Sequence, residues 1–198
     1  MSNTKFNEMR HNRKRQQYRF VLGIQQLFNY PVLNLIWVLF AFGALFLRTI
    51  EKKYITSVDI YPLFETFFFI CVKIVFVIFP ITCAIGVIHF IGFCFAIKDE
   101  ADMELIFCDK RFVKNQLPML IFKKKNRKTR VVTREFYTTI PMAQWQERKE
   151  DICDRMDIHL IGEITYGGRK RNKGNHIRFD SAKGRKQKEK GILYDETF

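Results

Sequence analysis

Residues 63–97 read LFETFFFICVKIVFVIFPITCAIGVIHFIGFCFAI, and this apolar stretch decides the fold. It holds only one Glu, one Lys and one His as ionisable side chains. A single helix over it would be about 50 Å long, because each residue adds roughly 1.5 Å. The hydrocarbon core of a bilayer is only about 30 Å thick. The stretch therefore predicts either two short spans hinged at Pro80, or one span over residues 74–97 preceded by an aromatic segment at the membrane surface.

A second apolar run, PVLNLIWVLFAFGALFL at residues 31–47, carries no charge. Leu27 and Phe28 just before it extend it toward the length of a span. A signal peptide would be followed by a small-residue cleavage site, and none follows here. Residues 1–30 carry six Lys or Arg and one Glu, and residues 98–198 carry 24 Lys or Arg and 16 acids. Basic flanks stay on the cytoplasmic side of a membrane. Placing both basic ends there favours two spans over the three that a split at Pro80 would give.

The expected fold class is a membrane α-helical hairpin with two transmembrane helices, followed by a small cytoplasmic α+β domain. The predicted order is a basic cytoplasmic leader (1–30), a transmembrane hairpin with a short outside loop (31–97), a juxtamembrane helix (98–116) and a small basic α+β domain (117–198). The expected location is the cytoplasmic membrane, as a multi-pass protein with both termini in the cytoplasm. The cluster HNRKRQQYR at residues 11–19 is interpreted as a topology signal, with contact to anionic headgroups or nucleic acid as the alternative.

The soluble part is expected to alternate between short helices and strands. Acids in the first turn of the helix after the membrane fit its dipole, and β-branched and aromatic content favours the strands. The predicted elements are a helix over 98–115, a strand over 117–122, a basic hairpin tip at 123–128, a returning strand over 129–138, a helix beginning near Pro141, an alternating strand over 157–166, a turn at 167–168, a strand over 176–179 and a basic loop over 182–191. In the helix after Pro141 we predict a partner-docking stripe of Trp145, Ile152 and Met156.

Sequence motifs for catalysis are absent from the chain. It contains no GxxxxGK[ST], HExxH or GxSxG, and its five cysteines show no metal-site spacing. We therefore expect no enzyme activity, no cofactor and no metal in this chain alone. Intramembrane His89 is interpreted as a neutral imidazole hydrogen-bonded to a neighbouring helix.

Basic side chains gather at three predicted tips. Such tips contact phosphates, and charge alone leaves both nucleic acid and anionic lipid open as the ligand. The candidate phosphate contacts are Lys123, Lys124, Lys125, Arg127, Lys128, Arg130, Arg169, Lys170, Arg171, Lys173, Lys183, Arg185 and Lys186.

Two stretches, FVKNQLPMLI at 112–121 and EFYTTIPMAQWQERKEDICDRMDIHLI at 135–161, resemble a known family. They are similar to the N-terminal half of FtsK/SpoIIIE-like DNA translocases encoded on integrative and conjugative elements of Gram-positive bacteria. In that family a membrane hairpin precedes a helix, a strand with an F…N…P-L pattern and an EF…IP…W…K…I…LNI segment. The matching positions are Phe112, Asn115, Pro118, Leu120, Glu135, Phe136, Ile140, Pro141, Trp145, Lys149, Ile152, Met156, Asp157 and Ile158.

The resemblance implies the membrane-anchored, non-catalytic adaptor portion of an FtsK-like DNA translocation or conjugative coupling system. The partners it implies are the membrane, DNA, an FtsK-like ATPase, relaxosome or secretion-channel proteins, and further copies of the chain. Members of the family continue into a P-loop ATPase about where this sequence ends, so ATPase activity is expected only in a separate or missing domain. The alternative function is a small membrane protein of a mobile element that regulates or inhibits a membrane complex through a protein partner.

Overall fold

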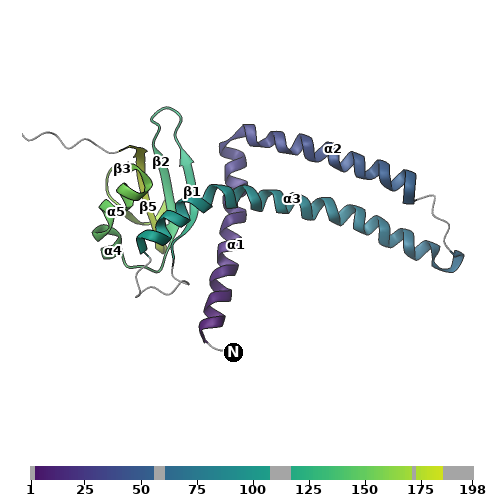
Figure 1. The fold of residues 1–198 in the computed structure, drawn as a ribbon, viewed down its shortest axis with the longest axis horizontal. Helices are drawn as coiled ribbons and strands as arrows, with labels where there is room; N and C mark the ends of the chain where they lie inside the picture. The colour runs from purple at the N-terminus through teal and green to yellow at the C-terminus, as the bar shows by residue number, and fades with distance from the viewer. Residues whose placement is uncertain (1–2, 56–60, 108–116, 171–172, 185–198) are drawn as a thin grey trace, which may run out of the picture. The chain divides into compact units, whose positions relative to one another are not determined.

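The computed structural model describes residues 3–55, 61–107, 117–170 and 173–184. The chain divides into two compact units, Met1–Ile97 and Lys98–Phe198. Helices build the first unit, and a small antiparallel sheet with short helices builds the second (Figure 1).

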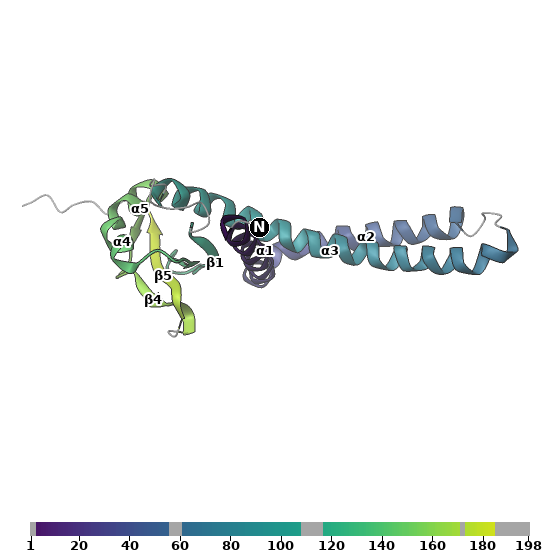
Figure 2. The same ribbon diagram turned by 90° about the horizontal axis from the view of Figure 1, so that it is seen from below.

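The first unit consists of helices. Its elements are α1 (Asn3–Asn29), a 3-10 turn (Pro31–Asn34), α2 (Leu35–Ile50), a π-helical turn (Glu51–Ile55) and the first part of α3 (Pro62–Phe107). Both views show α2 and α3 running side by side (Figures 1 and 2). Two helical segments, Pro31–Lys53 and Pro62–Phe107, are long and apolar enough to cross a membrane, as the sequence predicts.

Helix α3 is continuous through Pro80. Proline lacks the N–H that would bond to the preceding turn, and apolar helices tolerate this where hydroxyl side chains adjust the local bonding. The carbonyl that Pro80 leaves without its donor is that of Phe76, four residues earlier, and the nearby Thr82 hydroxyl donates to the carbonyl oxygen of Phe79 at 2.8 Å. The helix passes through Pro80 without the hinge that the disfavoured alternative of two short spans requires, and the aromatic residues 63–73 belong to the same helix instead of forming a separate segment.

The basic leader folds as a helix, α1, which crosses α3 at two glycines. A Cβ atom on Gly23 would overlap the carbonyl oxygen of Ile88, and one on Gly92 would overlap that of Arg19. The two backbones can therefore meet this closely only because glycine occupies both positions. At the crossing, the imidazole of His89 is hydrogen-bonded to the side chain of Gln16, which confirms the predicted bond to a neighbouring helix.

The second unit is built around β5 (Lys173–Lys183), the longest strand. The sheet order is β1 (Met119–Lys125), β2 (Val132–Tyr137), β5, β3 (Ile158–Leu160), and β4 (Thr165–Gly167) also pairs with β5. All the pairs are antiparallel. Two short helices, α4 (Met142–Glu147) and α5 (Lys149–Met156), connect β2 to β3.

An aromatic cluster forms the core of this unit. The Trp145 ring lies 4.8 Å from that of Phe107 and 5.9 Å from that of Phe136, which stacks on Phe179 at 5.8 Å. Phe136 and Phe179 lie on the same face of the sheet, because Phe136 is paired with Ile177, two residues before Phe179. Paired residues, and residues two apart on one strand, share a face. Helix α4 and the end of α3 therefore cover this face.

The predicted separate helix over 98–116 is instead the end of α3 as far as Phe107, and the rest of it lies outside the described residues. Its acids consequently do not sit in a first turn. Asp99 binds Arg134 and Lys123, Glu100 accepts the backbone N–H of Leu120 at 3.3 Å, and Asp102 pairs with Arg155. They bind the sheet and α5.

Three strand boundaries also differ from the predicted ones. Residues 123–125 belong to β1, so the hairpin tip begins at Asn126. The predicted strand over 157–166 is divided into β3 and β4, and the strand predicted over 176–179 extends to the eleven residues of β5. A lysine run is compatible with a strand whose side chains alternate between a half-buried face and solvent.

Candidate functional site

A groove of about 1000 Å³ lies in the second unit, beside the β1–β2 hairpin tip. Its walls come from the end of β1, the start of β2, the end of α5 and the C-terminal end of β5. The residues that line it are Lys98, Lys125, Arg130, Val132, Arg134, Met156, Asp157, Ile158, Ser181, Ala182, Lys183 and Gly184.

The lining of this groove is strongly basic. Five of its residues are Lys or Arg, and Asp157 is the one acid among the described lining residues. Lys98, Lys125, Arg130 and Lys183 are exposed. A concave surface with one sign of charge concentrates counter-ions, so the groove is suited to an anionic ligand. We call it the basic groove.

Arg134 is held beneath the basic groove by a buried network. Its Nε lies 2.9 Å from Oδ2 of Asp99, and its Nη1 donates to the Ser181 hydroxyl at 2.6 Å. Lys123 Nζ reaches the same Asp99 oxygen at 2.9 Å. Asp99 therefore neutralises much of the charge of Arg134, and the four exposed cations supply the attraction for an anion.

Local turn geometry fixes the two sides of the basic groove. The hairpin tip is closed by the Asn126 side chain, which accepts the N–H of Lys128 at 3.0 Å, and by Arg130 in the left-handed region at φ 58°. On the other side, Gly184 has a φ of 85° and donates its N–H to the Asp157 carbonyl at 2.9 Å. A residue with a side chain rarely adopts the Gly184 conformation, so this glycine helps place Lys183.

The predicted phosphate contacts do not form one patch. Lys125, Arg130 and Lys183 come together in the basic groove, whereas Arg169 and Lys173 lie near the other end of β5. Lys173 is the first residue and Lys183 the last of the eleven-residue strand β5. At roughly 3.3 Å per residue they are about 33 Å apart. Lys124, Arg127 and Lys128 are exposed but do not line the groove, and Lys123 is half-buried. The side chain of Lys170, together with Arg171, Arg185 and Lys186, lies outside the described residues.

Two of the five basic residues that line the groove, Lys98 and Arg134, are not among the phosphate contacts predicted from the sequence. Lys98 follows the apolar run within α3, and Arg134 lies within a strand. The only available signal for Arg134 was a charge inside an otherwise β-branched and aromatic run, and such a charge needs a buried partner. Asp99, its partner, lies 35 residues away.

The predicted partner-docking stripe belongs to the core. Trp145 and Ile152 are 0% exposed, so they cannot offer a surface to another protein. Met156 is half-buried and lines the basic groove. An apolar stripe on a helix packs equally well against a core or a partner, and here it packs against the aromatic core.

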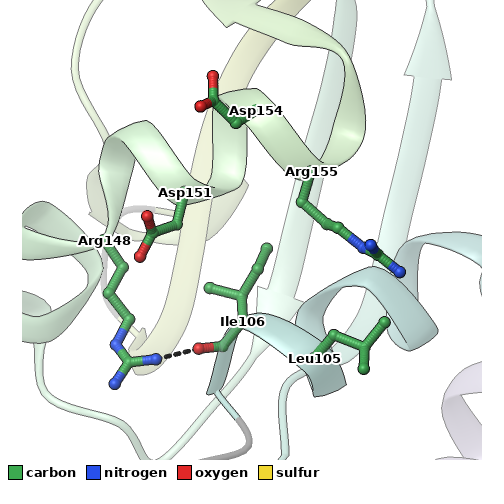
Figure 3. Close-up of a pocket in the computed structure, with 6 residues that line it drawn as sticks. All are labelled: Leu105, Ile106, Arg148, Asp151, Asp154 and Arg155. Carbon is green, nitrogen blue, oxygen red and sulfur yellow. Dashed lines mark hydrogen bonds between the residues drawn. The ribbon is translucent and has the colours of Figure 1, made fainter.

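A second hollow of about 570 Å³ lies between the end of α3 and α5 (Figure 3). Its charged lining is balanced, with Arg148 and Arg155 facing the same space as Asp151 and Asp154. Arg148 donates to the carbonyl oxygen of Ile106. Because both signs of charge are present in equal number, this hollow attracts anions less than the basic groove does.

The opposite face of the sheet carries a buried carboxylate, Glu135. It lies 2.6 Å from Nδ1 of His176 and accepts the backbone N–H of Arg169 at 3.2 Å. The Arg169 guanidinium covers the Phe122 ring at 4.2 Å. These contacts fix the turn after β4. Among the described residues, no three His, Cys, Asp or Glu side chains gather closely enough to hold a metal ion.

Burial raises the pKa of the Cys153 thiol, and a backbone hydrogen bond with Leu160 offsets the effect only in part. Since the thiolate is the reactive form, folded Cys153 should react with iodoacetamide more slowly than an ordinary thiol at about pH 8. Its rate should still rise with pH where an ordinary thiol has levelled off. Mass spectrometry of a variant that keeps only this cysteine measures the rate. The same variant in urea is the control, and equal rates in the two states would contradict the prediction.

Comparisons with known proteins give one match. No family model matches the chain, and neither does any curated protein. One solved structure, the pCW3 conjugation coupling protein TcpA in its monomer form with ATPgS, is similar over 44% of this chain, with 22% sequence identity and a TM-score of 0.37. The match spans only 24% of that protein's length. At this TM-score the backbones agree too little for the likeness to carry a functional argument.

Proposed function

We propose that the chain is a membrane-anchored, non-catalytic adaptor of a conjugative DNA-transfer system, and that its basic groove binds the phosphates of DNA. The observation that carries the DNA part of the proposal is the groove itself, with four exposed cations around one concave surface. Phosphate contacts of this kind supply affinity and position DNA without reading its sequence.

The membrane part of the proposal rests on α2 and α3. In both candidate spans the most apolar window is 0% buried, and side chains such as Leu39, Phe42 and Phe67 are at least two-thirds exposed. Apolar surface on this scale needs a partner, and lipid provides one along the whole length of a span. The basic leader and the basic second unit would then both lie on the cytoplasmic side.

The family resemblance supports the adaptor part of the proposal. Several of the matching positions are core residues here, and Leu120, Phe136, Trp145 and Ile152 are 0% exposed. The resemblance therefore concerns mainly the packing of the second unit, and three further matching positions, Met156, Asp157 and Ile158, line the basic groove. We propose that this unit joins a motor or a relaxosome protein to the membrane while it holds DNA.

The test is a DNA-binding titration of the full chain in non-ionic detergent, at several salt concentrations. In the groove variant, Lys125, Arg130 and Lys183 are replaced by Gln. Because each lost phosphate contact lowers the salt slope by about one unit, this variant should lose about three units of slope and most of the affinity. Fluorescence anisotropy of a labelled duplex measures both quantities.

The matched control changes three exposed cations outside the basic groove, Lys124, Lys128 and Lys173, to Gln. It has the same net charge as the groove variant. If DNA binds in the basic groove, this control variant should keep most of the affinity, because its substitutions lie outside the groove. Equal losses in the two variants would show that only overall charge matters. Binding that anionic vesicles abolish and zwitterionic vesicles leave intact would favour lipid as the ligand of the groove.

A further inference from the structure

Helix α1 carries an apolar stripe on one of its faces. Phe6, Met9, Phe20, Ile24 and Leu27 follow one another at intervals of three, eleven, four and three residues, which places them on one side of a helix. Phe6, Met9 and Ile24 are 58%, 46% and 36% exposed. The stripe therefore needs an apolar environment that the described residues of the first unit do not provide.

Exposed cations flank this stripe. On a helical projection, Lys5 and Arg10 fall on its two sides and Arg13 falls within it, and all three are exposed. Glu8 is the one acid in the sequence of α1. An apolar stripe flanked by Lys and Arg is the pattern of a helix that lies in a membrane interface, where basic side chains extend toward headgroup phosphates.

Two contacts hold α1 at one end of the apolar hairpin. The glycine crossing fixes it at the level of residues 88–92 of α3. Its C-terminal end is fixed by Tyr30, whose ring stacks on Phe95 at 5.6 Å, and the candidate span that contains α2 begins at the next residue, Pro31. The helix therefore lies beside residues 88–95 of α3 and next to the start of the span that contains α2.

We propose that α1 lies in the surface of an anionic bilayer, with its apolar stripe among the acyl chains and with Lys5, Arg10 and Arg13 against lipid phosphates. This inference rests on the proposed anchoring of α2 and α3. The partner is a lipid surface and not nucleic acid, because the cations border an apolar stripe, which lipid can cover and the phosphates of DNA cannot.

The experiment measures the depth of nitroxide labels on the full chain in vesicles of equal phosphatidylcholine and phosphatidylglycerol. Single cysteines replace Phe6, Met9 or Ile24 in a background whose native cysteines are serine. Power saturation compares accessibility to oxygen, which concentrates in the acyl region, with accessibility to a water-soluble nickel complex. The oxygen-to-nickel ratio at the stripe should be several-fold higher than at control labels on α1.

The control positions are Glu8 and Asn12, which are exposed on another face of α1. A label at Leu39, in the middle of α2, reports on the anchoring itself. Stripe labels that match the controls while the Leu39 label lies in the bilayer would overturn the present inference alone. A Leu39 label in water would overturn the anchoring and this inference with it. In vesicles of phosphatidylcholine alone the ratio at the stripe should fall, and an unchanged ratio would overturn the role of the three cations.

Discussion

Replacing Asp99 by Ala should lower the free energy of unfolding of the second unit by about 3–5 kcal/mol, because two cations lose their buried counter-ion. Its side chain is 3% exposed and lies 2.9 Å from both Arg134 and Lys123. The Arg134 side chain is 9% exposed and cannot reach bulk water without leaving the sheet, whereas that of Lys123 is 23% exposed and loses less. Urea unfolding measures the loss, and Trp145 fluorescence reports it in a chain whose other tryptophan, Trp37, is replaced by Phe.

Two further variants make this prediction specific. Asp180→Asn removes a half-exposed carboxylate 3.9 Å from Arg178, and it should cost less than about 1 kcal/mol. Combining Asp99→Leu with Arg134→Met removes both charges of the closest pair, so the double variant should be destabilised by less than the sum of the single changes. An Asp99→Ala chain with an unchanged urea midpoint would contradict the structural role of the network.

Replacing Gly92 by Ala should separate α1 from α3, because the new Cβ would overlap backbone, which cannot rotate away. We expect a loss of about 3 kcal/mol from the crossing, at the upper end for overpacking. Trypsin cleavage after Arg19 measures it, since this side chain is only 9% exposed and its carbonyl lies against Gly92. When cleavage follows the equilibrium of opening, the rate should rise about 100-fold.

Two other glycines of the same unit provide matched controls. A Cβ atom on Gly43 or Gly86 would meet nothing within 4 Å, so Ala should leave cleavage after Arg19 unchanged. Gly23→Ala should behave like Gly92→Ala, because its Cβ would overlap the Ile88 carbonyl. If all four variants were cut at the wild-type rate, the close crossing of the two helices would be wrong.

Periodic patterns in the sequence were enough to predict the two apolar helices, the β1–β2 hairpin and the start of a helix after Pro141. These features depend on residues that are close together in the sequence. The length of an apolar run and the alternation of apolar and polar residues are therefore enough to predict them. For the leader, the basic cluster indicates a topology signal, with contact to headgroups or nucleic acid as the alternative. Its basic cluster hid the apolar residues that recur at helical spacing on either side of it, and so α1 was not predicted.

The basic groove could be predicted only in part, because its basic residues come from segments that are far apart in the sequence. Lys125 and Arg130 are neighbours in sequence, but Lys183 joins them because β5 pairs with β2, and Lys98 belongs to the end of α3. A run of basic residues predicts an exposed loop, but it does not predict which loops lie close together in the folded protein. Trp145 shows the same limit, since its helical spacing fits a core and a docking surface equally well.

The position of β5 in the chain sets the order in which the protein can be built. Strands β2, β3 and β4 all pair with β5, yet among the described strands β5 is the last to leave the ribosome. Both apolar helices are synthesised long before the sheet can close, so membrane insertion does not have to compete with a folded domain. A ribosome that stalls before residue 173 would leave three strands without their common neighbour and their backbone N–H and C=O groups open to aggregation.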